Sequence, residues 1–249
     1  LVGLTVSASV RTTDGSTVSD VLAISSLENP VDLPSLEELK KKVTDFADNL
    51  MELKETPMIE EYYTGPVLFE EGAASRLFTD NLLSPGRLLA LRTMTPARGM
   101  LDEQLGRKIM DSRLTVKNYT TLVEYDGTPL FGHYEIDGDG VVPAAELTLV
   151  ENGVFKRMLN GRVPTLKAPE STGSARFMIS PDNPVAIVSP GTIHVQTSKS
   201  VAPEKLKKAL LKAAKEADLE YAYIVRRIGG EASAVYLSLL HISEPTRRS

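Results

Sequence analysis

The chain offers few of the nitrogen and sulfur side chains that bind transition metals. It contains three histidines, His133, His194 and His241, and no cysteine. A protein metal site needs several donor side chains within about 2 to 2.5 Å of the ion. The histidines are widely separated, and none follows the His-Glu-x-x-His spacing that places two ligands on one helix face. We therefore predict no metal site and interpret His133 and His194 as ordinary strand residues.

An acidic turn, Asp-Gly-Asp-Gly at residues 137–140, resembles the start of a calcium-binding loop. Counted from its last glycine, Glu135 and the two aspartates take the first ligand positions, and Glu146 falls where such a loop needs its final glutamate. Strand patterns nevertheless flank the turn, whereas the calcium motif has helices there. We predict a tight turn, with calcium binding as the alternative.

A third candidate is the small polar loop Ser171–Arg176, with the sequence Ser-Thr-Gly-Ser-Ala-Arg. Backbone N–H groups around Ser171, Thr172 and Gly173, with the charge of Arg176, would suit a peptide carboxylate or a phosphate. A plain connection is the alternative. Serine nucleophiles are not predicted, because the chain has no Gly-x-Ser-x-Gly and no paired histidine base. It also has no Walker or dinucleotide glycine pattern.

The elements at the start of the chain are predicted from periodicity. Two alternating runs, Leu4–Thr12 and Thr17–Ser25, flank an Asp-Gly pair and predict a hairpin. Ser35 and Glu38 then form a capping-box pattern that opens a helix. Its apolar face has three- and four-residue steps: Leu36, Leu39, Val43, Phe46, Leu50 and Leu53.

The rest of the chain alternates helices with short strands. We predict a strand at Val67–Phe69, a helix at Glu71–Leu83, a helix from Pro203 to Ala217 and a returning strand at Tyr221–Val225, with Leu88–Gly106 ambiguous. Between them lie short β-rich runs: Leu114–Asp126, Glu146–Val150, Val154–Leu159, Val185–Val188 and Thr192–Thr197. The predicted class is α+β: an N-terminal α/β portion, then a β-rich, mostly antiparallel sheet or barrel-like portion.

We predict domain limits at residues 1–105 for the α/β portion and 106–236 for the β-rich portion. Both ends look unusual. The chain opens on a strand pattern without methionine, so any targeting segment would lie outside it. Residues 237–249 resemble a translated sequencing adapter. We expect this tail to be non-native and to carry no function.

Composition narrows the function classes. Hydrophobic residues form 42% and charged residues 24% of the chain, as in a soluble globular protein. The net charge of −5 argues against a nucleic-acid partner, and no apolar run reaches the roughly 18 residues of a membrane helix. The absence of cysteine suits a reducing compartment, so we predict the cytoplasm, with export left open.

Several stretches share one order along the chain: Tyr63–Glu70, Gly72–Phe78, Leu105–Ile109 with Leu114–Val116, Ile136–Val141, Leu149–Phe155 and Ser171–Arg176. Together, from about residue 60 to 230, they resemble the TldD/PmbA family, first described as modulators of DNA gyrase and now regarded as metallopeptidases. The resemblance implies a zinc peptidase with His-Glu-x-x-x-His on a helix and a further ligand, often cysteine, near the C-terminus. It also implies paired subunits, so the expected partner is the chain itself or a homologous family member, and a peptide is a possible ligand.

The zinc motif does not carry over. The matching positions here are Thr79, Asp80 and Ser84. A hydroxyl cannot replace imidazole as a zinc ligand. Asp80 remains a weak candidate for the general base, because it would have no metal-bound water to activate. We therefore predict a family member without a zinc cofactor, either non-catalytic or divergent.

Two alternatives stay open. The chain could be an active metallopeptidase with atypical ligands, in which case His133 and His194 would have to approach each other. It could instead be a peptide-binding or assembly module that uses an edge strand such as Thr192–Thr197 for strand addition.

Overall fold

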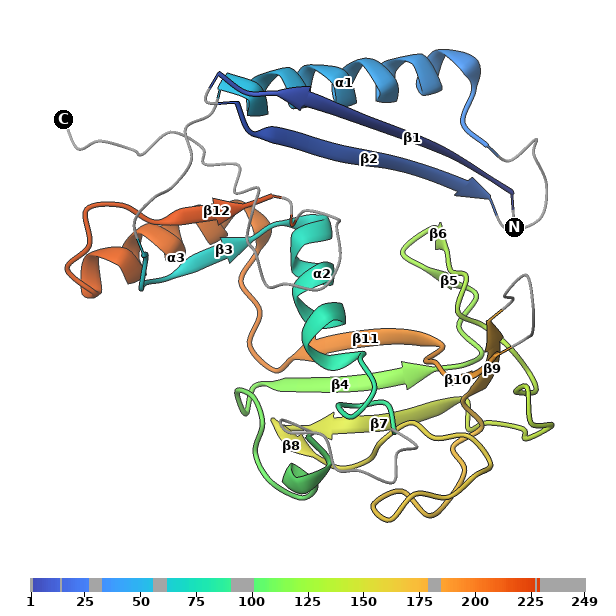
Figure 1. The fold of residues 1–249 in the computed structure, drawn as a ribbon. Helices are drawn as coiled ribbons and strands as arrows, with labels where there is room; N and C mark the ends of the chain where they lie inside the picture. Colours follow the sequence, from blue (N-terminus) through green and yellow to red (C-terminus); the bar gives the residue numbers. More distant parts are fainter. Residues whose placement is uncertain are drawn as a thin grey trace. The chain divides into compact units, whose positions relative to one another are not determined.

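The computed structural model describes residues 2–13, 15–26, 33–55, 62–90, 101–178, 185–226 and 228. It confirms the α+β class, with three α-helices and mostly antiparallel strand pairs in these residues, and the described strands close no barrel (Figure 1). The chain divides into two compact units, Leu1–Leu77 with Val201–Ser249, and Phe78–Ser200. This grouping by contacts differs from the division at residues 105 and 106, which stays a prediction about independently folding domains.

The first unit begins with the expected hairpin. Strands β1 (Val2–Arg11) and β2 (Thr17–Ser26) pair antiparallel along their whole length. Thr12 closes the turn, because its N–H donates to Ser16 O at 2.9 Å and its carbonyl accepts from Gly15 N at 3.1 Å. Gly15 has φ +90°, a conformation that favours glycine. The Asp-Gly signal therefore marks the turn correctly.

Helix α1 (Leu36–Glu55) packs against this hairpin (Figure 1). Its predicted capping box is present: Ser35 N donates to Glu38 Oε2 at 2.8 Å, and Glu38 N donates to Ser35 Oγ at 3.3 Å. The hydrogen bonds from Ser35 lower the pKa of Glu38. The predicted apolar face is buried mainly in its second half, at Phe46, Leu50 and Leu53, whereas Leu36 is 68% exposed.

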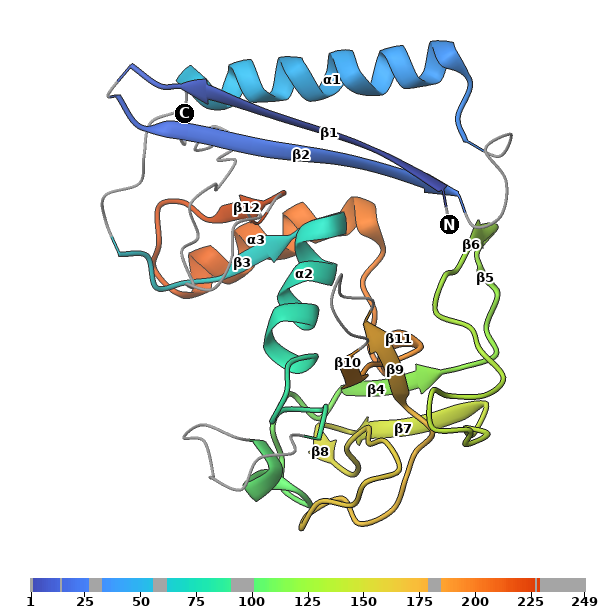
Figure 2. The ribbon, with the colours of Figure 1, turned by 45° about the vertical axis from the view of Figure 1, so that its right-hand side comes forward.

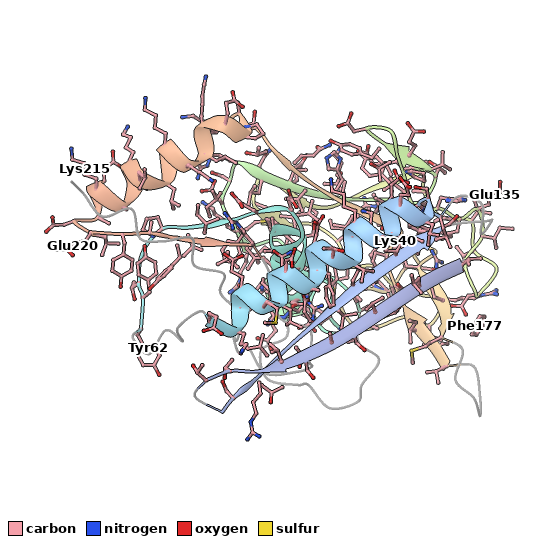
Figure 3. The ribbon with its side chains drawn as sticks, turned by 90° about the horizontal axis from the view of Figure 1, so that it is seen from above. Lys40, Tyr62, Glu135, Phe177, Lys215 and Glu220 are labelled. Carbon is pink, nitrogen blue, oxygen red and sulfur yellow. The ribbon has the colours of Figure 1, made fainter. Side chains whose placement is uncertain are left out.

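A parallel pair that the sequence did not predict also belongs to the first unit. Strand β3 (Val67–Phe69) pairs in parallel with β12 (Tyr223–Val225), and α3 (Pro203–Glu216) contacts β3. Leu210 and Ala214 are buried on the inner face of α3. Lys215 projects outward from the same helix (Figure 3).

The second unit is built on a four-stranded antiparallel sheet in the order β11-β4-β7-β8 (Figure 2). Its strands are β4 (Leu114–Tyr119), β7 (Glu146–Glu151), β8 (Val154–Phe155) and β11 (Thr192–Thr197). The predicted run Val154–Leu159 forms a strand only as far as Phe155. Beyond it, Leu159 exchanges hydrogen bonds with residues 88 and 90 instead of continuing along β7.

Smaller elements complete this unit. The boundary between the two units, at residues 77 and 78, falls within helix α2 (Glu71–Leu82), and η2 (Leu101–Gln104) is a short 3₁₀ turn. Two further antiparallel pairs are β5 (Glu124–Tyr125) with β6 (Thr128–Pro129), and β9 (Ala175–Met178) with β10 (Val185–Val188). Much of the ambiguous stretch Leu88–Gly106, namely residues 91–100, lies outside the described residues, as does the tail 237–249.

The faces of the four-stranded sheet differ. One face packs on an apolar core: Leu82, Leu88, Leu89, Ala90, Val116, Leu149, Val150, Phe155, Met158 and Leu159. The other face presents polar side chains from β11, β4 and β7, the usual division in an antiparallel sheet. None of the helices in the described part of the chain is both long and apolar enough to cross a membrane.

Candidate functional site

The three residues that the resemblance aligns with the family's zinc motif, Thr79, Asp80 and Ser84, lie at the end of α2 and just beyond it. Thr79 and Asp80 lie exposed in the last turns of the helix. Leu83 N donates to Thr79 O at 2.9 Å, and the helix ends at Leu82. Ser84 therefore lies beyond the helix, in a turn closed by Arg87 N donating to Ser84 O at 3.0 Å. Of these three positions, the helix itself holds one hydroxyl, which is a poor zinc ligand, and one carboxylate.

The two histidines of the alternative ligand set have separate hydrogen-bond partners. His133 is exposed, with Nδ1 3.4 Å from Leu130 O. His194 lies on the polar face of β11 beside Gln196. Within the described ranges, no three histidine, aspartate or glutamate side chains gather as metal ligands. His241 lies outside those ranges.

The acidic turn has a structural role. Asp137 is buried, and its carboxylate accepts three backbone hydrogen bonds. Oδ1 accepts from Asp139 N at 2.9 Å and Val141 N at 2.8 Å, and Oδ2 accepts from Ala175 N at 2.9 Å. Charge-assisted bonds of this kind satisfy backbone donors that would otherwise be buried without a partner. The carboxylate thus ties two loops together.

The other acids of the calcium-like pattern have different surroundings. Asp139 Oδ2 accepts from Arg162 N at 2.7 Å. Glu135 is exposed and projects outward (Figure 3). Glu146 forms an ion pair with Lys117, at 2.6 Å between Oε1 and Nζ. These observations favour the tight-turn interpretation over the calcium loop.

Most backbone N–H groups of the polar loop Ser171–Arg176 donate hydrogen bonds to other groups of the protein. Thr172 N and Ser174 N both donate to Asn160 O at 3.2 Å, and Gly173 N donates to Ser171 Oγ at 3.1 Å. Thr172 Oγ1 also donates to Asn160 O and accepts from Asn160 N. An incoming anion would have to compete with these bonds. The loop is therefore built first of all to dock against Asn160 and the acidic turn.

Arg176 is the group of this loop that remains best placed for a ligand. Its guanidinium carbon lies 3.2 Å from the centre of the Tyr134 ring, and Nη1 donates to Ala175 O at 3.0 Å. Tyr134 Oη in turn donates to Gly173 O at 2.7 Å. Stacking on a tyrosine face holds an arginine in place while leaving other N–H donors available. Anion binding at Ser171, Thr172, Gly173 and Arg176 stays a prediction. Arg176 is the member of this set that we expect to contact an anion.

Sequence reasoning missed a cluster on the polar face of the sheet. The His194 ring meets Tyr125 edge-on, with ring centres 5.1 Å apart, and Tyr119 at 6.2 Å. Gln196 Nε2 lies 3.4 Å from His194 Nδ1. The alternation of β11 and β4 was the available signal, because in-register antiparallel strands place His194 opposite Lys117 and Thr192 opposite Tyr119. The registers themselves came only from the fold.

Three neighbouring side chains on this face, Lys117, Glu146 and Tyr119, have shifted pKa values. The hydrogen bond with Glu146 raises the pKa of Lys117, and the same bond lowers the pKa of Glu146. Burial, followed by the hydrogen bond to Glu146, raises the pKa of Tyr119. The ammonium and carboxylate therefore remain charged together near neutral pH, and Tyr119 remains a neutral phenol.

The chain is thus an α+β protein whose second unit is built on a four-stranded antiparallel sheet, and this fold also occurs in proteins of known structure. Residues 62–232 match the PmbA/TldA metallopeptidase C-terminal domain. The chain therefore belongs to the PmbA/TldD family.

Individual relatives agree with this assignment. A metalloprotease from Methanothermobacter thermautotrophicus is 40% identical over 91 residues, which are 36% of this chain and 18% of the relative. A putative modulator of a DNA gyrase from Thermotoga maritima shares the fold with a TM-score of 0.53 and 19% identity, over 92% of this chain and 45% of that chain. TldE from Thermococcus kodakarensis shares the fold with a TM-score of 0.53 and 18% sequence identity, over 92% of this chain and 46% of that chain. The chain thus corresponds to less than half the length of these relatives.

Proposed function

We propose that this chain is a non-catalytic or divergent member of the PmbA/TldD family, one that keeps the family scaffold without zinc-dependent peptide hydrolysis. The proposal is supported by the end of α2, where the family resemblance aligns Thr79, Asp80 and Ser84 with the zinc motif and where Ser84 falls outside the helix. Hydroxyls bind zinc poorly compared with imidazole, thiolate or carboxylate. Without a bound metal, Asp80 has no activated water to deprotonate.

Zinc content and hydrolysis together test this proposal. The purified protein is incubated with zinc and dialysed, bound metal is measured by mass spectrometry, and cleavage of a fluorogenic peptide library is followed with and without EDTA. We expect substoichiometric zinc and no EDTA-sensitive cleavage. Stoichiometric zinc with EDTA-sensitive cleavage would overturn the proposal.

A reconstructed motif provides the matched comparison. The triple variant Thr79→His, Asp80→Glu, Ser84→His restores imidazoles at the matching positions. We expect it to bind more zinc than the parent chain, because two imidazoles replace two hydroxyls at the ligand positions and a glutamate replaces the aspartate at the position of the base. Equal zinc binding by the variant and the parent would show that α2 does not occupy the place of the family's metal helix.

The second candidate is a peptide-binding or assembly module that pairs with itself or with a homologous subunit. The observation that favours it is the position of β11 at the edge of the sheet. Exposed strand edges commonly recruit extended segments. Light scattering during size-exclusion chromatography, with and without a purified homologous family subunit, tests the pairing. A mass equal to one chain in both runs would contradict it.

A further inference from the structure

Six pairs of aspartate or asparagine followed by glycine occur in the chain, and all six could undergo the same spontaneous reaction. The glycine nitrogen attacks the side-chain carbonyl of the residue before it, an approach that no Cβ obstructs. The succinimide ring that forms opens with water, either to aspartate or to isoaspartate, in which the main chain runs through the side chain. The pairs begin at Asp14, Asp126, Asp137, Asp139, Asn152 and Asn160.

The two pairs of the acidic turn are held at both reacting groups. Asp137 is buried with its carboxylate fully engaged, and Gly138 N donates to Ala175 O at 2.9 Å. Gly140 N donates to Asp137 O at 3.1 Å, and the carboxylate of Asp139 accepts a backbone N–H at 2.7 Å. Nitrogens and carboxylates fixed in separate hydrogen bonds cannot approach each other, so these pairs are protected.

Two further pairs are restrained in other ways. Asn160 is completely buried, and its Nδ2 donates to Ala168 O at 2.7 Å. At the start of the chain, Gly15 N donates to Thr12 O at 3.1 Å, while Asp14 lies outside the described residues. A glycine nitrogen or an amide held in this way is withdrawn from ring closure.

The remaining two pairs form turns of the same kind. Asp126–Gly127 joins β5 to β6, and Asn152–Gly153 joins β7 to β8, each as a two-residue hairpin turn. The φ angles are +49° and +74° in the β5–β6 turn, and +49° and +79° in the β7–β8 turn. Positive φ at both positions is the usual conformation of such turns. Both turns begin with an exposed residue, so they differ mainly in their contacts.

Only the β7–β8 turn is fixed to a neighbouring strand. Gly153 N donates to Leu114 O at 2.8 Å, and a Cβ at Gly153 would meet backbone atoms at 2.5 Å. In the part of the chain that the structure describes, neither Gly127 N nor the Asp126 carboxylate has a hydrogen-bond partner. A Cβ at Gly127 would meet nothing within 4 Å. The reacting nitrogen of the β5–β6 turn is therefore free and uncovered.

The β5–β6 hairpin also has little to hold it closed. Its strands are two residues long, and all four strand residues are exposed. So short a two-stranded ladder is marginal by itself, and local opening is easiest where few buried contacts exist. Opening allows the side chain of Asp126 to rotate until its carbonyl carbon meets Gly127 N.

We propose that Asp126 is a site of spontaneous isoaspartate formation, singled out among the six pairs by the free N–H of Gly127. Gly127 N bonds to Cγ of Asp126, and one carboxyl oxygen leaves as water. A second water then cleaves the bond between the same nitrogen and the main-chain carbonyl carbon of Asp126. One water is released and one is consumed, so the change needs no oxidant, reductant or further reactant.

The product changes the polar face of the sheet. Isoaspartate adds a methylene to the main chain inside a turn whose length sets the hairpin register. Tyr125 precedes this turn, and its ring centre lies 5.1 Å from that of His194. The modification therefore displaces the Tyr125 ring from His194.

Mass spectrometry of the aged full chain tests the site. The folded protein is kept at neutral pH and body temperature, and samples taken over several weeks are digested and fragmented by electron transfer, which distinguishes isoaspartate from aspartate. We expect isoaspartate at Asp126 to accumulate at least about tenfold faster than at Asp137 or Asp139, because the reaction requires local opening. A parallel sample in concentrated urea gives the rate of each pair without the fold.

The variant Asp126→Asn supplies a matched comparison within one chain, since both hairpin turns then begin with asparagine. We expect residue 126 to deamidate about tenfold faster than Asn152 in the folded variant, and at a similar rate in urea. The control Asp126→Glu keeps the charge but would have to close a larger and less favourable ring. On ageing, the imidazole NMR signals of His194 should change in the parent chain and stay constant in this control.

Three results would overturn the inference. Equal rates at the two turns of the folded Asp126→Asn variant would remove the role of the Gly127 N–H. Absence of isoaspartate at Asp126 in the folded parent, while the urea sample reacts, would remove the site. Constant His194 signals during isomerisation would contradict the displacement of Tyr125. All three results are independent of zinc content and of subunit pairing, which test the proposed functions separately.

Discussion

The end of α2 and the loop pair, defined as residues 134–141 and 171–176, differ in what their polar groups do. At the end of α2, Thr79 and Asp80 are exposed on a helix surface, where packing permits many residue types. In the loop pair, Asp137 is buried and accepts three backbone hydrogen bonds, and Tyr134 holds both Gly173 and Arg176.

The comparison separates evidence for fold from evidence for activity. Two stretches that carry the family resemblance, Ile136–Val141 and Ser171–Arg176, form the loop pair. Their residue types are required for hydrogen bonding within the protein, so their presence supports the scaffold. The residues that the resemblance aligns with the zinc motif belong to the other region, where they are two hydroxyls and one acid. Family membership and catalytic chemistry therefore rest on different residues.

The largest effect is expected for Asp137→Ala in the loop pair. The variant removes a carboxylate that accepts three N–H groups, one of them from the buried Ala175. We expect a loss of about 3 kcal/mol in the free energy of unfolding, measured by urea denaturation. A loss below about 1 kcal/mol would show that the loop pair does not depend on this carboxylate.

Two glycines of the loop pair test how tightly it is packed. Gly173 and Gly140 both have positive φ, +67° and +78°, but a Cβ at Gly173 would lie 2.9 Å from Pro143, whereas a Cβ at Gly140 would meet nothing within 4 Å. We expect Gly140→Ala to cost about 1 kcal/mol from backbone strain alone, and Gly173→Ala about 2 to 3 kcal/mol. Thermal unfolding of both variants checks the difference. Equal costs would mean that the contact with Pro143 relaxes freely.

A smaller, pH-dependent effect is expected at Lys117 and Glu146. The pKa of Glu146 is lowered, so the stability contributed by the pair is present above the ordinary glutamate pKa of 4.5 and is lost as the pH falls through the folded value below it. The pKa of Lys117 is raised above 10.5, so the contribution is also lost as the pH rises through that folded value. A double-mutant cycle with Lys117→Met and Glu146→Gln, measured at neutral and acidic pH, should show coupling only at neutral pH. Coupling of the same size at both pH values would contradict an ionic origin.

The smallest effect is expected for Asp80→Ala. Asp80 is exposed on α2, and substitutions at such positions usually change stability by about 0.5 kcal/mol or less. Urea denaturation of Asp80→Ala and Asp137→Ala under the same conditions compares their losses in the free energy of unfolding. A loss of more than about 1 kcal/mol would show that the end of α2 is structurally constrained, and would weaken the contrast between the two regions.

Local sequence rules succeeded where one short segment contains all the information. The hairpin turn at Gly15, the capping box of Ser35 and Glu38, and Pro203 at the start of α3 each depend on neighbouring residues. The tight turn around Asp137 also follows from its local Asp-Gly pattern. The family resemblance was visible for a related reason, because it lies in residue order along the chain.

The sequence by itself predicted the α+β class, the first hairpin and the three helices, and it carried the resemblance that aligns Thr79, Asp80 and Ser84 with the zinc motif. The tertiary structure alone decided the parallel pairing of β3 with β12, the docking of Asp137 on Ala175, and the His194 cluster with its open β11 edge. The physical reason is the separation along the sequence between the residues that interact. Caps, turns and periodicity act over a few residues, whereas strand partners and their registers are selected by burial summed over distant segments.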